Sequence, residues 1–331
     1  MSIDQVAQVT ITILMDNFTD LLLANSANAK RQPLIMNEKI KLPPPMAEHG
    51  FSALVHIDKI NQDGIDTNLR GCSFLFDAGV SENGVSINAD RLGIDLEHID
   101  GIILSHGHFD HFTGLHSIIK KIRSKRSDFI LNLYTHPDAF LRRWLVLPDG
   151  KRARMPVLDE KQLEQLGANI QKDSSVRILP GDNNPLFLIT GEIPRETIFE
   201  KGFPFQHAEE LNGKKLRHDP LVKDDQALVA NVKNKGLVIL TACGHSGIIN
   251  TIKYAKRITG IDKIHAIIGG FHLPSGGIYE DAIEPTIEEL LKSNTDHIIP
   301  CHCTGWKAIN RIIEAFGEKF IPTSVGTTFT F

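Results

Sequence analysis

The feature that most constrains this chain is a run of ligand-type side chains directly after a short apolar segment. Residues 101–104, Gly-Ile-Ile-Leu, predict a buried strand, and Ser-His-Gly-His-Phe-Asp-His follows them. Residues two apart on extended backbone share a face, so His106 and His108 can approach one ion. The chain then turns toward a predicted helix, which can bring Asp110 and His111 toward a second ion.

Imidazoles combined with a carboxylate indicate a transition-metal site. These donors suit zinc, iron and manganese, and the chain has only 4 cysteines, too few for a closed structural zinc site. The spacing is more regular than a chance cluster among 15 histidines would be. Amidohydrolase barrels also carry a His-x-His pair at a strand end, but that pair usually lies near the start of the chain and lacks the following Asp-His.

Apolar strand-like segments alternate with helical periods in both halves of the chain. The expected strands are residues 9–14, 51–57, 71–76, 101–104, 129–134, 227–232, 236–240, 264–268 and 297–299. The expected helices are residues 88–92, 115–123, 247–257, 283–292 and 306–316. This alternation predicts a layered α/β protein.

We expect a single domain over residues 1–331. Residues 137–215 are rich in charges and prolines, with strand-like stretches only at 176–179 and 186–190. This segment is therefore the expected substrate-specific insertion. Prolines 43–45 lack a ladder donor and predict a long loop before the second strand.

Composition narrows the expected partners and location. The net charge is −4, so no basic excess indicates nucleic acid or an anionic membrane. The few cysteines favour a reducing compartment, and neither a basic leader nor an apolar run of about 18 residues is present. We expect a cytoplasmic protein that binds a small molecule; the sequence does not predict its oligomeric state.

The His-x-His-x-Asp-His pattern resembles the signature of the metallo-β-lactamase superfamily. The resemblance implies an αββα sandwich with two divalent metal ions at one edge between the sheets, zinc first and iron or manganese as alternatives. It implies that His106 and His108 bind one ion and that Asp110 and His111 bind the other. Asp77 matches an early aspartate that supports the ligand loop by hydrogen bonding.

The remaining ligands must come from strand ends in the second half. His302, after an apolar strand, matches the last ligand histidine of the superfamily. The usual third-motif histidine is not in its usual place, and His245 is the expected substitute. Cys243 stands where a bridging aspartate is common, and a buried neutral thiol is favoured over a metal contact. Asp224 and Asp225 are further possible ligands, although a solvated pair at a strand entry is favoured.

Several segments together are similar to a narrower group, the 7,8-dihydropterin-6-methyl-4-(β-D-ribofuranosyl)aminobenzene 5'-phosphate synthase-like proteins. That activity joins a pterin bearing a methyl diphosphate to an arylamine and expels diphosphate, a step in which two cations have a plain use. The segments that carry the resemblance are residues 15–17, 48–52, 75–79, 104–115, 224–228, 243–248, 269–273 and 301–305.

Other residues near these motifs are candidates for binding or support. His272, beside a Gly-Gly pair, can present an imidazole to a phosphate and is a candidate catalytic residue, with a structural loop histidine as the alternative. His49 has the same two interpretations, and Asn17 is either a turn residue or a neighbour of the site. Cys301 and Cys303 are expected to point away from the ligand face, because they flank His302 on an extended loop.

These observations lead to one functional hypothesis and two alternatives. We expect a dinuclear metal-dependent enzyme acting on a small, phosphorylated substrate, with transfer of a dihydropterin methyl group as the named possibility. The first alternative is a hydrolase of an ester, lactone or phosphodiester, in which Asp110 would also orient the attacking water. The second is a metal-stabilised small-molecule sensor without turnover.

Overall fold

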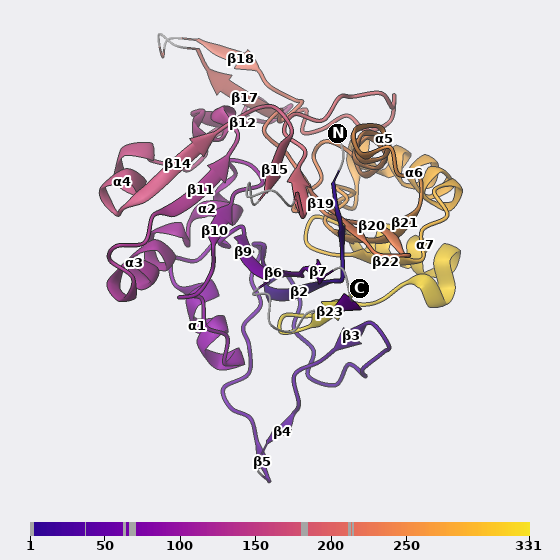
Figure 1. The fold of residues 1–331 in the computed structure, drawn as a ribbon. Helices are drawn as coiled ribbons and strands as arrows, with labels where there is room; N and C mark the ends of the chain where they lie inside the picture. Colours follow the sequence, from indigo (N-terminus) through magenta and orange to yellow (C-terminus); the bar gives the residue numbers. More distant parts are fainter. Residues whose placement is uncertain are drawn as a thin grey trace.

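Two large β-sheets pack face to face, and helices cover the outer face of each sheet (Figure 1). The computed structural model describes residues 3–36, 38–61, 64–65, 71–179, 185–210, 213 and 215–331. Buried apolar side chains form one cluster between the sheets and one beneath the helices on each outer face. The alternation of strands and helices thus produces the predicted αββα sandwich.

The first sheet has eight strands and carries the histidine run. Its order is β14 (Ala168–Lys172), β11 (Leu131–Thr135), β10 (Gly101–Ile103), β9 (Cys72–Phe76), β6 (Ser52–Asp58), β2 (Gln8–Met15), β23 (Thr328–Thr330) and β3 (Ala29–Lys30). Apolar faces of α1 (Gly84–Leu92), α3 (Leu115–Lys125) and α4 (Glu160–Gln165) pack on its outer side. Because β9, β10 and β11 run parallel, their carboxyl ends lie at one edge, where the short α2 (Phe109–Phe112) begins.

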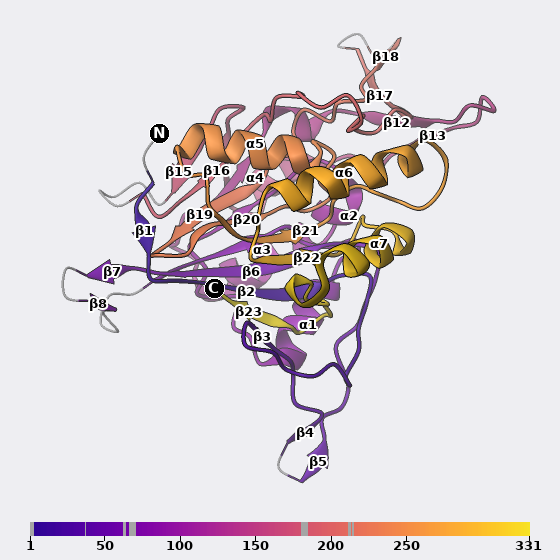
Figure 2. The same ribbon diagram turned by 90° about the vertical axis from the view of Figure 1, so that its right-hand side faces the viewer.

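The second sheet has seven strands and supplies three more loops at the same edge of the sandwich. Its order is β15 (Arg177–Leu179), β16 (Phe187–Ile189), β19 (Leu228–Val232), β20 (Gly236–Leu240), β21 (Ile264–Gly269) and β22 (His297–Pro300), and β1 (Gln5–Val6) also pairs with β19. Figure 2 shows α5 (Ile248–Thr259), α6 (Glu280–Lys292) and α7 (Trp306–Phe316) along its outer side. The parallel β20, β21 and β22 direct the loops that carry His245, His272 and His302 to one place.

A separate four-stranded sheet stands beside the sandwich, at the top of Figure 1. It consists of β13 (Arg152–Arg154), β12 (Arg143–Val146), β17 (Gln206–Glu209) and β18 (Leu216–His218). The expected insertion at 137–215 is therefore not one continuous addition, since β14, β15 and β16 lie within it and belong to the two main sheets. Residues 180–184, 211–212 and 214 of that segment lie outside the described residues, and its role in substrate choice stays a prediction.

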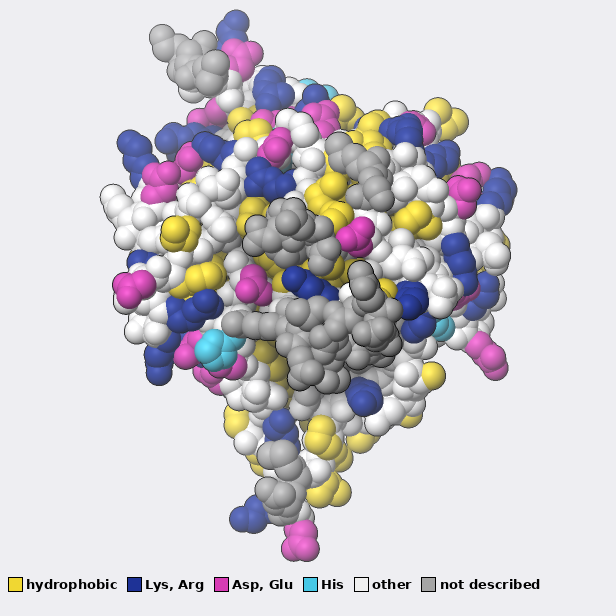
Figure 3. All heavy atoms as spheres, viewed as in Figure 1, with side chains coloured by type: hydrophobic (Ala, Val, Ile, Leu, Met, Phe, Trp, Pro, Cys, Tyr) yellow, Lys and Arg dark blue, Asp and Glu magenta, His cyan; other side chains and the backbone are white. Residues whose placement is uncertain are grey.

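The remaining elements are short. Hairpins join β4 (Ile35–Met36) to β5 (Lys39–Ile40) and β7 (Ile60–Asn61) to β8 (Gly64–Ile65), and single-turn helices are η1 (Pro137–Phe140), η2 (Gly277–Tyr279) and η3 (Gly317–Lys319). Cationic and anionic side chains are interspersed over the face in Figure 3. None of the helices among the described residues has the length and apolar character needed to cross a membrane.

Candidate metal centre

The histidine run and the loops after β20, β21 and β22 meet where the two sheets present their carboxyl edges. Close packing shapes the first loop, because a Cβ on Gly107 would lie 2.1 Å from the carbonyl oxygen of Ala139. Backbone turning shapes the others: Asp77, His272 and His302 have φ of 60°, 45° and 45°. These left-handed conformations are uncommon for residues with a Cβ and cluster at functional sites.

Three imidazoles converge on one point and form the first ligand cluster. His106 Nε2 and His245 Nε2 each lie 3.0 Å from His108 Nδ1, and all three residues are buried. A single cation can satisfy three such lone pairs at once, which hydrogen bonds among the rings cannot do. His245 thus joins His106 and His108 in one cluster, and its role as the substitute for the third histidine stays a prediction.

Hydrogen bonds to the outer nitrogens set the tautomers of two of these rings. Ser105 Oγ donates to Asp77 Oδ2 at 2.7 Å and therefore accepts from His106 Nδ1 at 2.9 Å. His108 Nε2 donates to Gln206 Oε1 at 2.5 Å. Both inner nitrogens are then unprotonated. Burial lowers the pKa of both rings, that of His108 to about 4 with a contribution from the nearby Arg143, so both imidazoles are in the neutral form that can bind a metal ion at physiological pH.

A carboxylate and two imidazoles form the second ligand cluster. Asp110 Oδ2 lies 3.4 Å from both His111 Nε2 and His302 Nε2, and the two imidazole nitrogens lie 3.3 Å apart. His111 Nδ1 donates to the buried Asp77 at 2.7 Å, which leaves Nε2 directed at the cluster. Asp77 also accepts the Ser105 backbone N–H at 2.7 Å, so it connects the two clusters without belonging to either.

Electrostatics differ between the two clusters. Burial alone would lower the pKa of His111, but the Asp110 and Asp77 carboxylates outweigh it and raise that pKa to about 9. The imidazoles of His111 and His302 hold the pKa of the Asp110 carboxyl well below its usual range, although burial alone would raise that pKa. In the metal-free protein the second cluster is therefore an ion pair, whereas the first is a set of neutral rings.

Cys243 lies between the two clusters. Its Sγ is 3.1 Å from His111 Nε2, and it forms ligand-type groups both with Asp110, His111 and His302 and with His106 and His245. Within each group the donor atoms lie within 4.8 Å of one another. The resemblance to the superfamily implies a bridging aspartate at this position, and the Cys243 thiol lies within reach of both clusters. A metal contact by Cys243 stays a prediction.

The expectation that Cys301 and Cys303 both point away from the site is wrong for Cys303. Cys303 Sγ lies 3.3 Å from Cys243 Sγ, while Cys301 packs in the core between the sheets. The alternation expected of an extended loop fails because His302, at φ 45°, turns the chain. His302 and Cys303 can then face the same side.

The expectation of a solvated pair at Asp224 and Asp225 is also wrong, since both are buried. Asp224 accepts the Gly107 backbone N–H at 2.7 Å and forms an ion pair with Arg143, which is itself buried. Asp225 accepts the Ser246 backbone N–H at 2.7 Å and lies 3.9 Å from His106 Nδ1. Both aspartates support ligand loops through the backbone.

Asn17 and His49 lie at the outer side of the second cluster. Asn17 Nδ2 donates to the His302 carbonyl oxygen at 2.7 Å, and its Oδ1 lies 3.1 Å from His49 Nδ1. His49 stacks on the His302 ring and is 3.8 Å from Asp110, while 65% of its side chain is exposed. His49 therefore lies on the solvent-facing side of the second cluster, and its contact with a substrate stays a prediction.

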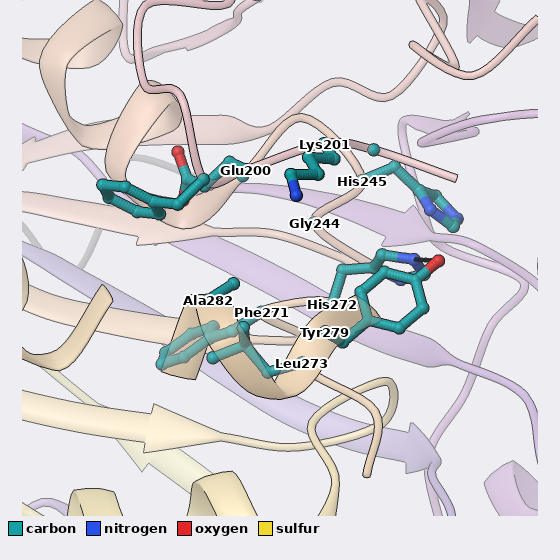
Figure 4. Close-up of a pocket in the computed structure, with 12 residues that line it drawn as sticks. Glu200, Lys201, Gly244, His245, Phe271, His272, Leu273, Tyr279 and Ala282 are labelled. Carbon is teal, nitrogen blue, oxygen red and sulfur yellow. Dashed lines mark hydrogen bonds between the residues drawn. The ribbon is translucent and has the colours of Figure 1, made fainter. Parts of the chain in front are cut away.

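His272 lines a pocket beside the first cluster, shown in Figure 4. Its ring centroid is 4.0 Å from that of His245, and its Nε2 is 3.3 Å from the Tyr279 hydroxyl. Lys201 also lines this pocket, and Phe203 stacks on His245. Every candidate from the sequence thus lies at or beside the two clusters, although their individual roles stay predictions.

The sequence alone did not identify Gln206, Arg143 and Ser105 as residues that support the histidine loop. Ser105 directly precedes the histidine run, and this position could have marked it as a supporting residue. Gln206 and Arg143 lie in the segment expected to be an insertion, among polar residues of no evident pattern. Nothing local in the sequence marks them as partners of the ligand loop.

The donor set of this centre fits divalent metal ions. Imidazole nitrogens, one carboxylate and one thiol converge in buried positions, and this mixture suits zinc or iron better than magnesium or calcium, which prefer oxygen. His245 Nδ1 and His302 Nδ1 are buried without a hydrogen-bond partner among the described residues. If His245 and His302 carry their ring protons on Nδ1, their Nε2 atoms are unprotonated and can bind a metal ion.

Comparisons with known proteins show the family and the fold of this chain. Residues 68–171 match the model of the metallo-beta-lactamase superfamily. The chain is similar in fold to Tm1679, described as a metal-dependent hydrolase of the beta-lactamase superfamily, with a TM-score of 0.68, 24% identity and coverage of 97% of this chain and 98% of that one. It is also similar to the metallo-beta-lactamase fold protein YhfI from Bacillus subtilis, with a TM-score of 0.51, 12% identity and coverage of 98% and 100%.

Two curated proteins of Methanocaldococcus jannaschii are similar in sequence over most of the chain. One is an uncharacterized protein, 34% identical over 284 residues, which span 85% of this chain and 92% of the relative. The other is 7,8-dihydropterin-6-methyl-4-(beta-D-ribofuranosyl)-aminobenzene-5'-phosphate synthase, 32% identical over 293 residues, which span 87% of this chain and 92% of the relative. The chain therefore belongs to the metallo-beta-lactamase superfamily and, within it, to the group of proteins that resemble this synthase.

Proposed function

We propose that this protein is a dinuclear metal-dependent enzyme that transfers a dihydropterin methyl group from diphosphate to an arylamine. The observation that carries the proposal is the pair of adjacent ligand clusters with Cys243 between them. The substrate class comes from the similarity to the dihydropterin synthase of Methanocaldococcus jannaschii.

The proposed centre assigns one ion to each cluster. His106, His108 and His245 would hold the first; Asp110, His111 and His302 would hold the second. Cys243 belongs to both possible ligand groups and would contribute a thiolate, since a thiol that ligates a divalent ion loses its proton even though burial raises the pKa of Cys243 in the metal-free protein. Two divalent ions supply Lewis-acid stabilisation of the negative charge that develops on a departing diphosphate.

The residues of the adjacent pocket would orient the two substrates. Lys201 offers a cation to phosphate oxygens, and Tyr279 holds the His272 ring from one side. The His272 ring lines the pocket, where it would meet a substrate, and its buried Nδ1 has no hydrogen-bond partner among the described residues. Phe203 stacks on His245 and would help to exclude water from the ligand cluster.

The transfer balances without an added reactant. The arylamine nitrogen forms a bond to the methyl carbon, and the carbon–oxygen bond to diphosphate breaks with its electron pair. The amine then gives up one proton, for which we propose His272 as the acceptor. Water must be kept out, because hydrolysis of the same bond would compete.

The decisive experiment compares substrates on the metal-loaded protein. We expect diphosphate release from a dihydropterin methyl diphosphate only when an arylamine ribosyl phosphate is present. The His302→Ala variant should lose this activity, and His218→Ala, on exposed β18, should retain it.

Other outcomes would favour the alternatives. Release of acid or alcohol from esters, lactones or phosphodiesters without an arylamine would indicate a hydrolase. Tight binding of the pterin with no turnover would indicate a sensor, and either result would contradict the transferase.

A further inference from the structure

A side chain from outside the two ligand-bearing sheets contacts the metal centre directly. Gln206, on β17 of the four-stranded sheet, accepts a hydrogen bond from His108 Nε2 at 2.5 Å, and both side chains are buried. The two residues are 98 positions apart in the chain. The contact therefore exists only because the four-stranded sheet packs beside the histidine loop.

The surroundings of Gln206 determine which way its amide points. Its Nε2 donates to the carbonyl oxygen of Asp219 at 3.1 Å and to the Asp219 carboxylate at 3.0 Å. A flipped amide would place its oxygen against these two acceptors and is excluded by repulsion. Gln206 Oε1 must then face His108, so His108 carries its proton on Nε2 and presents a lone pair on Nδ1.

The network continues from Gln206 to the other side of the histidine loop. Arg143 Nε lies 3.7 Å from the Asp219 carboxylate, and the Arg143 guanidinium forms an ion pair with Asp224. Asp224 in turn accepts the Gly107 backbone N–H. One chain of buried polar contacts thus holds both the His108 ring and the backbone next to it.

We propose that Gln206 is a positioning residue for the metal centre, which fixes the tautomer and the ring orientation of His108 from the four-stranded sheet. The inference rests on the proposed metal centre but not on the proposed reaction. A partner that orients a ligand imidazole typically contributes about 10–100-fold to metal affinity. The expected effect is confined to the cluster of His106, His108 and His245.

The test replaces Gln206 by methionine, which has similar length but no strong acceptor. Cobalt(II) is titrated into the metal-free wild type and Q206M, with a competing chelator and with visible absorption as the readout. We expect the affinity for one equivalent to fall about 10–100-fold and its absorption spectrum to change, while the other equivalent binds as in the wild type. If Q206M does not fold, Gln206→Asn serves instead, because its side chain is one methylene shorter and moves the amide oxygen away from His108.

A matched control separates positioning from general stability. Asn88 is another fully buried amide, which bonds to the backbone of Leu14 and Met46 on the outer side of the first sheet. Asn88→Leu should lower the unfolding temperature without changing either cobalt affinity. Wild-type affinities and spectrum in Q206M would overturn the inference while leaving the metal centre in place. A wild type that binds no cobalt would instead overturn the centre itself.

Discussion

The two halves of the sandwich build the metal centre in different ways. The first half supplies four ligand-type side chains from one turn after β10, and the outer nitrogens of its imidazoles bond to Ser105, Gln206 and Asp77. The second half supplies its ligands from separate strand ends. Two of its imidazoles, His245 and His302, have an outer nitrogen with no hydrogen-bond partner among the described residues.

The difference indicates where the centre is preorganised. In the first half, buried side-chain hydrogen bonds orient each imidazole before a metal arrives. In the second half, the backbone holds the loops: the His302 N–H donates to Asp16, and the Ser246 N–H donates to Asp225. We therefore expect changes to supporting groups to cost more in the first half than in the second.

The largest effect should come from the buried cation behind the first-half loop. Arg143→Met leaves the buried Asp224 without its counter-ion, which should lower the free energy of unfolding by about 3–5 kcal/mol. Arg311→Met removes an exposed cation paired with Glu284 and should leave the free energy of unfolding almost unchanged, because solvent screens this ion pair. Urea denaturation of both variants measures the difference. Equal losses would show that the network does not hold the loop.

Removing one ligand from each half should separate the two clusters. His108→Ala and His302→Ala should each weaken one metal equivalent by more than about 100-fold, because even outer-shell changes cost about 10–100-fold. Metal analysis after dialysis should find one equivalent in each variant and two in the wild type. Retention of two equivalents in both variants would contradict the assignment of ligands.

Asp77 and Asp16, the carboxylates that support ligand loops of the first and the second half, test the comparison of the two halves most directly. Asp77→Asn removes an acceptor shared by Ser105 and His111 and should weaken metal binding by about 10–100-fold. Asp16→Asn keeps an oxygen for the His302 backbone N–H and should cost less than about 10-fold. Chelator competition measures the metal affinity of both variants and so gives the ratio of the two losses. A larger loss for Asp16→Asn would reverse the ranking of the two halves.

The pH dependence of metal binding should also differ between the clusters. The Asp110 and Asp77 carboxylates overcome burial and raise the pKa of His111 to about 9, so a metal must displace a proton there at neutral pH. Below pH 9 the affinity of that cluster should fall at least about tenfold more per pH unit than the affinity of the first cluster. Burial lowers the pKa of His108 to about 4, so the rings of the first cluster add no pH dependence between about pH 6 and 8 beyond the loss of the Cys243 proton, which both clusters share. Titrations at three pH values measure both, and equal slopes would contradict the difference.

Much of the fold and the convergence of the histidine loop were predictable from local pattern. Apolar segments such as 101–104 and 264–268 identified the parallel strands, because buried strands need continuous apolar residues. The four ligands of the first loop share a short stretch of chain, so their spacing alone indicated convergence. The orientation of Cys303 was not predictable, because it depends on a positive φ at His302 that no residue type requires.

By itself, the sequence determined the alternation of strands and helices, the ligand types of the histidine loop and the strand ends that complete the centre. Only the tertiary structure decided which groups orient those ligands. Gln206 and Asp224 reach the loop across 98 and 117 residues of chain, and each is buried by contacts made after the sheets have packed. Periodicity reports which face of an element is buried, whereas partners of buried polar groups depend on how distant elements meet.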